Sequence, residues 1–62
     1  MCLSTVYFRD AEKKEPVAKN VAAVRTKDGK LVLTDILGVT TELDAEIETI
    51  DLMENYIYVR RK

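Results

Sequence analysis

A chain of 62 residues has room for one domain, and a core of that size often needs a partner or a cross-link to be stable. The single cysteine excludes an internal disulfide. A net charge of −1 argues against nucleic-acid binding, because proteins of that class usually carry a basic surface. There is neither a signal-peptide pattern nor an apolar run near the roughly 20 residues that cross a bilayer. We therefore expect one cytoplasmic domain over residues 1–62.

The first half of the chain alternates between strand patterns and turn signals. Residues 2–8 alternate with both faces partly apolar, which predicts a strand that is covered on both sides. Residues 9–19 are highly charged and contain the only proline, so we expect an exposed loop. Residues 20–26 and 31–36 have strand patterns, and the Asp-Gly pair at 28–29 predicts a tight hairpin between them, because both central turn positions favour positive φ.

The second half continues the β pattern. Gly38 interrupts a β-rich stretch and predicts a bend or bulge. Residues 45–52 carry apolar side chains spaced by three and then two positions, which favours a strand with a local bulge. A tight connection follows, because Asn55 can adopt a left-handed conformation, and residues 56–61 form the last alternating strand.

Five to seven short strands, with turn signals about ten residues apart, predict an all-β fold. The architecture that we expect is a small antiparallel β-barrel, whose closure removes the exposed strand edges that promote aggregation. The expected core consists of apolar residues from every strand: Val6, Val24, Leu31, Leu33, Ile36, Ile47, Ile50, Leu52, Ile57 and Val59.

The chain offers few residues for catalysis. It has no histidine to act as a general base and only two glycines, so neither a hydrolytic triad nor a glycine-rich phosphate loop can be built. Asp44, Glu46 and Glu48 fit a solvated acidic face better than a calcium-binding loop. We expect a protein that is not an enzyme, in which Asp51 has a structural role as a cap of the turn toward Asn55.

Cys2 is the remaining candidate, because it directly follows the initiator methionine. If Met1 is removed, the α-amine and thiolate of Cys2 can close a chelate ring on one metal ion. The backbone nitrogen of Leu3 can add a third donor once it has lost its proton. Amine, amidate and thiolate donors in one plane suit nickel(II) or copper(II), and not tetrahedral zinc. The opposing interpretation is a small buried cysteine with no ligand role.

One chain supplies at most one thiolate. A two-fold dimer with its N-termini near the axis would bring two Cys2 residues together and complete four coordination positions between the subunits. The marginal size of the chain and its lone cysteine would then have one explanation.

Three stretches carry a family resemblance: the opening "MCLSTVY", the hairpin "DGKLVLTDILG" and the later "IETIDLMENYIYV". Together they resemble the CooT family, small nickel-binding accessory proteins linked to maturation of nickel-containing carbon monoxide dehydrogenase. The resemblance implies a homodimeric small β-barrel in which Cys2 binds Ni(II). The opening "MCL" is also similar to HypC-type hydrogenase maturation chaperones, but their isoleucine-proline-glycine continuation is missing.

The expected function is that of a nickel carrier, which takes Ni(II) through Cys2 and the backbone of Leu3. It would hand the metal to a nickel-dependent enzyme such as carbon monoxide dehydrogenase, or to another accessory protein. The alternative is a small RNA-binding barrel, because Tyr56, Tyr58 and Arg60 share one strand face, although the acidic pI makes a nucleic-acid partner unfavourable. A third interpretation is an interaction module whose metal site is inactive.

Overall fold

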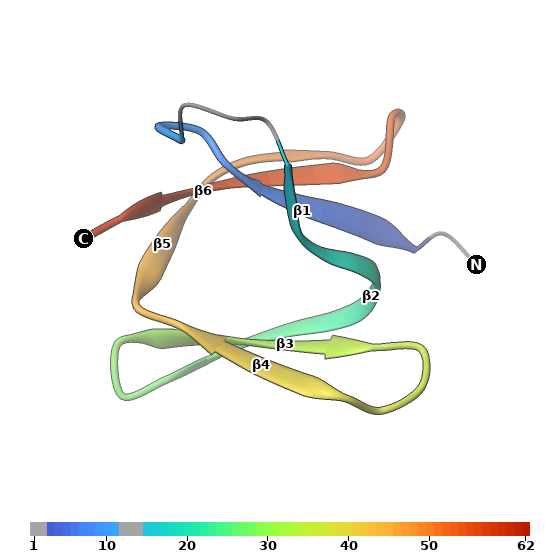
Figure 1. The fold of residues 1–62 in the computed structure, drawn as a ribbon, viewed down its shortest axis with the longest axis horizontal. Helices are drawn as coiled ribbons and strands as arrows, with labels where there is room; N and C mark the ends of the chain where they lie inside the picture. Colours follow the sequence, from blue (N-terminus) through green and yellow to red (C-terminus); the bar gives the residue numbers. More distant parts are fainter. Residues whose placement is uncertain (1–2, 12–14) are drawn as a thin grey trace.

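The computed structural model describes residues 3–11 and 15–62, and the regular elements in these ranges are β-strands. The strands are β1 (Ser4–Phe8), β2 (Pro16–Lys27), β3 (Lys30–Asp35), β4 (Thr40–Leu43), β5 (Ala45–Asp51) and β6 (Tyr56–Arg61). They form a six-stranded sheet in the order β4-β3-β2-β1-β6-β5, curled into a half-barrel (Figure 1). The predicted all-β fold of five to seven short strands is confirmed.

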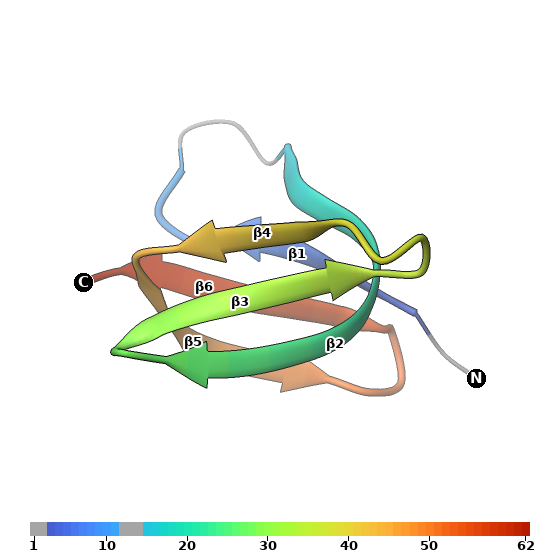
Figure 2. The same cartoon turned by 90° about the horizontal axis from the view of Figure 1, so that it is seen from below.

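The long strand β2 gives the sheet its curl. Its pairing with β1 and its pairing with β3 both contain register shifts, and Asn20 in the middle of β2 has a φ of 55°. Bulges and a left-handed residue bend a strand sharply. β2 therefore passes from a layer made with β1, β6 and β5 to a second layer made with β3 and β4, which Figure 2 shows from below.

Two details of strand pairing differ from the expected barrel. β1 and β6 are parallel, from Thr5 opposite Tyr56 onward, whereas the other pairs are antiparallel. The chain between these strands supplies the long connection that a parallel pair needs. The edge strands β4 and β5 are joined through Asp44 but do not pair with each other, so the sheet stays open along this seam.

The predicted loop at 9–19 is too long, because β2 begins at Pro16. Pro16 lies opposite Tyr7 as the first residue of the strand. A proline without an N–H is tolerated at that position, and the charges of this segment do not prevent a strand whose side chains are largely exposed. The part of the prediction that covers residues 12–14 lies outside the described residues.

The predicted turns are confirmed by their backbone angles. Asp28 and Gly29 have φ values of 52° and 77°, as expected for the centre of a tight hairpin. Asn55 has a φ of 59° in the β5–β6 turn, and Gly38 has a φ of 87° in the β3–β4 loop. Local residue preferences were sufficient to locate each of these reversals.

The predicted bulge in β5 is also confirmed. Ile47 lies opposite Val59 and Thr49 lies opposite Tyr58, so that Glu48 is an extra residue in the ladder. A residue inserted in this way shifts the alternation of the strand by one position. Ile47 and Ile50 therefore lie on the same face of β5, although they are three residues apart.

The core lies on the concave side of the curled sheet. Its buried residues are Val6, Val21, Leu31, Leu33, Ala45, Ile57 and Val59. Five of them were predicted, and Val24, also predicted, packs against the core while remaining half-buried. Val21 and Ala45 were not predicted as core residues.

Four predicted core residues are exposed, and that part of the prediction is wrong. Ile36 is 60% exposed because it follows the end of β3, and Leu52 is 78% exposed because it lies in the β5–β6 turn. Ile47 and Ile50 are 38% and 52% exposed, although they share the face of buried Val59 and Ile57. Within residues 3–11 and 15–62, β5 pairs with β6 and its other edge is unpaired, so facing inward does not bury them.

Two aspartate side chains stabilise the β3–β4 loop and the β5–β6 turn by hydrogen bonds to backbone amides. The carboxylate of Asp35 accepts hydrogen bonds from the amides of Leu37 and Val39, both at 2.9 Å. The carboxylate of Asp51 accepts from the amides of Met53 and Glu54 at 3.0 and 2.8 Å. The predicted capping role of Asp51 is therefore confirmed.

Replacing Asp51 by alanine is expected to lower the free energy of unfolding by about 1–2 kcal/mol, because two amides lose a charged acceptor. Asp51→Asn keeps one acceptor oxygen and should lose less. Asp44→Ala removes an exposed carboxylate that makes no hydrogen bond within the described residues, and serves as a matched control. Urea unfolding measures all three variants, and equal midpoints for Asp51→Ala and Asp44→Ala would refute the cap.

Candidate metal centre

The candidate ligands lie at the beginning of the chain. Cys2 is outside the described residues, and the description of this end starts with Leu3, which is half-buried and directly precedes β1. Ser4 lies opposite Val21 of β2 on one side of β1. On the other side, the amide of Thr5 donates to the carbonyl of Asn55 at 3.0 Å. The backbone of Leu3 therefore joins a strand that is held from both sides.

Two left-handed asparagines shape the surroundings of this strand end. Asn55 ends the β5–β6 turn, and Asn20 forms the bend of β2 next to Val21. The carbonyl of Asn20 also accepts a hydrogen bond from the amide of Ile36 at 2.9 Å, which ties the β3–β4 loop to this bend. Figures 1 and 2 show that the start of β1, the β3–β4 loop and the β5–β6 turn lie at the same end of the half-barrel.

These two connections expose large apolar side chains. Leu37 in the β3–β4 loop is 86% exposed, and Met53 in the β5–β6 turn is 91% exposed. Ile36, Val39 and Leu52 in the same connections are exposed as well. Large apolar side chains that are exposed at one end of a small protein are typical of a contact surface. We call Ile36, Leu37, Val39, Leu52 and Met53 the apolar tips.

The acidic residues do not form an alternative metal centre. Within residues 3–11 and 15–62, no three carboxylates come together in a way that could hold a metal ion. Glu46 pairs with Arg60 at 2.8 Å, and Glu48 pairs with Arg9 at 2.6 Å, all on exposed or partly exposed side chains. The predicted solvated acidic face is therefore what the structure contains. Since the chain has no histidine, the thiol of Cys2 is its one strong soft ligand.

The aromatic face that suggested RNA binding is a packed cluster. Tyr58 lies 5.7 Å from Tyr7 and 4.9 Å from Tyr56 between ring centroids, and all three tyrosines are half-buried. The guanidinium of Arg9 stacks 4.0 Å above the Tyr58 ring. Partial burial, and then the Asp51 carboxylate, raise the pKa of Tyr56.

This cluster favours a structural role for the tyrosines. Arg9 and Arg60 are paired with Glu48 and Glu46, so the face lacks the surplus positive charge that attracts a phosphate backbone. Sequence reasoning did not include Tyr7 and Arg9 in the aromatic face, because only the parallel pairing of β1 with β6 brings them to Tyr58. The structure gives the RNA-binding alternative no support.

The described residues contain no helix that is long and apolar enough to span a membrane.

Comparison with known proteins agrees with the observed fold. The family model described as "CO dehydrogenase accessory protein CooT" matches residues 1–60. A crystal structure described as a CooT from Carboxydothermus hydrogenoformans is similar with a TM-score of 0.89 and 21% sequence identity, over 98% of each chain. Among curated proteins, none matches this chain. At 21% identity the structural likeness shows the fold alone, whereas the family model extends over nearly the whole sequence. The chain therefore belongs to the CooT family of CO dehydrogenase accessory proteins.

Proposed function

We propose that this protein is a homodimeric nickel carrier that binds Ni(II) through Cys2 and delivers it to a nickel-dependent enzyme such as carbon monoxide dehydrogenase. The supporting observation is the family match, which covers residues 1–60 and so includes Cys2. In this proposal the protein is a cytoplasmic accessory protein with no catalytic activity of its own.

The donor atoms follow from the processed chain end. Removal of Met1 leaves an α-amine with a reference pKa near 7.7–8.0 beside a thiol near 8.5, so nickel must displace protons from both at neutral pH. The backbone nitrogen of Leu3 supplies a third donor when it is deprotonated. These donors are contiguous in the sequence, and Leu3 leads directly into β1, which is held on both sides. Of the proposed donors, the structure describes Leu3, and it lies next to a strand that is paired on both sides.

The apolar tips supply a surface for the second subunit. They lie at the same end of the half-barrel as the start of β1 (Figure 1). Two chains that associate through this end would remove the tips from water and bring their two Cys2 thiolates near the symmetry axis. The second subunit would then supply the donors that a four-coordinate planar site requires.

Native mass spectrometry of the protein from cells, with and without Ni(II), tests this function directly. The expected species is a dimer of chains that lack Met1, with nickel bound between them. Retention of Met1 in both chains, or nickel bound equally well by a chain without its free amine, would contradict the chelate. A nickel-loaded monomer would contradict the shared site.

Replacing Met53 or Leu37 by aspartate is expected to convert the dimer into a monomer, because a charge would be buried in the contact surface. Both side chains are almost fully exposed in the single chain, so the fold should be unaffected. Lys27→Asp, at the far end of the β2–β3 hairpin, is the control and should remain dimeric. Sedimentation velocity measures the change, and a dimer that persists in both tip variants would place the contact elsewhere.

A further inference from the structure

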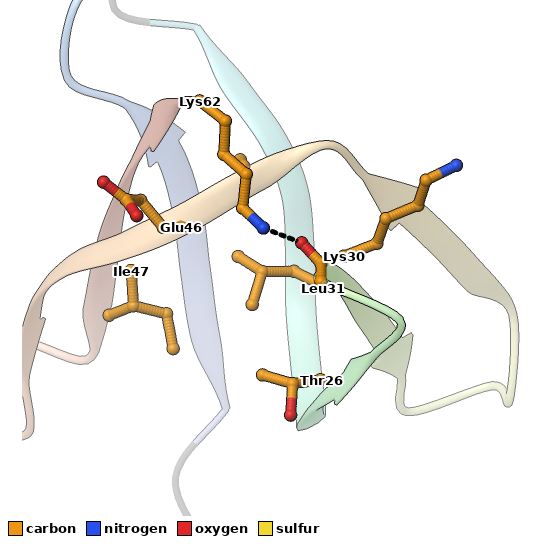
Figure 3. Close-up of a pocket in the computed structure, with 8 residues that line it drawn as sticks. Thr26, Lys30, Leu31, Glu46, Ile47 and Lys62 are labelled. Carbon is orange, nitrogen blue, oxygen red and sulfur yellow. Dashed lines mark hydrogen bonds between the residues drawn. The ribbon is translucent and has the colours of Figure 1, made fainter.

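The end of the half-barrel opposite the apolar tips contains a pocket of about 310 Å³. It lies between the β2–β3 hairpin, the first residues of β5 and Lys62 (Figure 3). Its apolar wall is formed by Leu31, Ala45 and Ile47. This volume is at the lower end of the range for pockets that bind small molecules.

The pocket exists because the sheet does not close. Ala45 is buried but small, and it begins an edge strand that does not pair with β4. Ile47 shares the inner face of β5 with Ala45, and there it remains 38% exposed and lines the pocket together with buried Leu31. An apolar surface is thus left accessible at the seam, and a ligand could cover it without moving the backbone.

Of the charged side chains around the pocket, one points across its mouth and two point away from it. The ammonium of Lys62 reaches across the mouth and donates to the carbonyl of Gly29. Lys30 directs its ammonium away from the pocket, and the Glu46 carboxylate also points outward (Figure 3). This carboxylate pairs with Arg60. Within the described residues, no carboxylate pairs with Lys62. One positive charge, bound only to a neutral acceptor, therefore faces an apolar wall.

We propose that this pocket binds a small aliphatic monocarboxylate. The aliphatic part would lie against Leu31, Ala45 and Ile47, where it removes apolar surface from water. The carboxylate would accept the hydrogen bond that Lys62 now donates to the Gly29 carbonyl, and a charge-assisted bond is stronger than one to a neutral oxygen. This site lies at the other end of the half-barrel from the start of β1 (Figure 1), so in this proposal binding does not depend on nickel.

Titration of the ¹⁵N-labelled full chain with 4-methylpentanoate, followed by amide chemical shifts, tests the proposal. The expected shifts are centred on Gly29, Leu31, Ala45 and Ile47. The neutral 4-methylpentanamide should bind at least about threefold more weakly, since it lacks the charge, and acetate should bind more weakly still because it lacks the apolar body.

The variant Lys62→Gln should bring the affinity for 4-methylpentanoate down to that of the amide, whereas Lys27→Gln, which removes a lysine outside the pocket lining, should leave it unchanged. Equal affinities of the acid and the amide for the unmodified chain would overturn the proposal, as would shifts centred elsewhere or none at all. The same titration of Cys2→Ala should give an unchanged affinity. This result separates the pocket from the nickel site, so that either proposal can fail alone.

Discussion

Replacing Cys2 by alanine is expected to lower the affinity for Ni(II) at least about hundredfold, because loss of a ligand costs more than the 10–100-fold effect of groups that merely orient ligands. The fold should be unaffected, since the described core is built from strand residues such as Val6, Leu33 and Val59. Calorimetric titration with Ni(II) measures the affinity, and thermal unfolding of the metal-free protein checks the fold. Equal nickel affinity for Cys2→Ala and the unmodified chain would remove the nickel-carrier proposal.

Variants of the neighbouring positions separate the donors. Leu3→Ala changes only a side chain and should retain nickel binding, whereas Leu3→Pro removes the backbone N–H that the third donor needs and should weaken it. Residues added in front of Cys2 should weaken binding too, because the amine then no longer belongs to the cysteine. If Leu3→Pro and Leu3→Ala bind equally, the backbone nitrogen is not a ligand.

The pH dependence of nickel affinity gives a further check on the same site. The thiol and the α-amine both release protons on binding, so the affinity should rise between pH 6 and pH 8 for the unmodified chain. Cys2→Ala should show a weaker dependence, since the thiol no longer contributes a proton to the release.

Replacing Leu33 by alanine is expected to destabilise the fold by about 2–5 kcal/mol, the usual effect of truncating a fully buried leucine. Leu33 is 2% exposed and is among the largest fully buried side chains of the described residues. A domain of this size has a total stability of only about 3–9 kcal/mol, so a large fraction of the variant should be unfolded. Urea unfolding followed by circular dichroism measures the loss.

Leu52→Ala is the matched control for this substitution. The same chemical change is made at a residue that is 78% exposed, and it should alter stability by no more than about 0.5 kcal/mol. Both variants should be compared at a protein concentration at which they are monomeric, because Leu52 belongs to the apolar tips. A similar loss in the two variants would mean that Leu52 is buried in the folded chain.

Local sequence was sufficient for features that depend on a few neighbouring residues. The Asp-Gly hairpin, the left-handed Asn55 and the bulge in β5 were all predicted, because each follows from the preferences or the spacing of adjacent residues. Cys2 was proposed as a ligand from its position in the sequence. It lies outside the described residues, so the assignment of nickel to Cys2 stays a prediction.

Burial could not be predicted in the same way. Ile36 and Leu52 lie just beyond strand ends, and the apolar pattern of the sequence does not show where pairing stops. Ile47 and Ile50 face the inner side, but the sequence does not reveal that the neighbouring edge of the sheet stays open. The apolar tips and the pocket both result from such long-range arrangements, which is why neither was predicted.

The central position of β1 has a consequence for biosynthesis. Thr5 and Val6 lie next to Tyr56 and Ile57, so β1 borders on a strand that the ribosome makes about 50 residues later. Contacts between such distant residues form slowly, and here they must wait until translation has reached β6. Until then one side of β1 has no neighbour, and the Asn55 carbonyl cannot hold Thr5. The start of β1, next to the proposed nickel site, is therefore fixed only after β6 has been synthesised and has paired with β1.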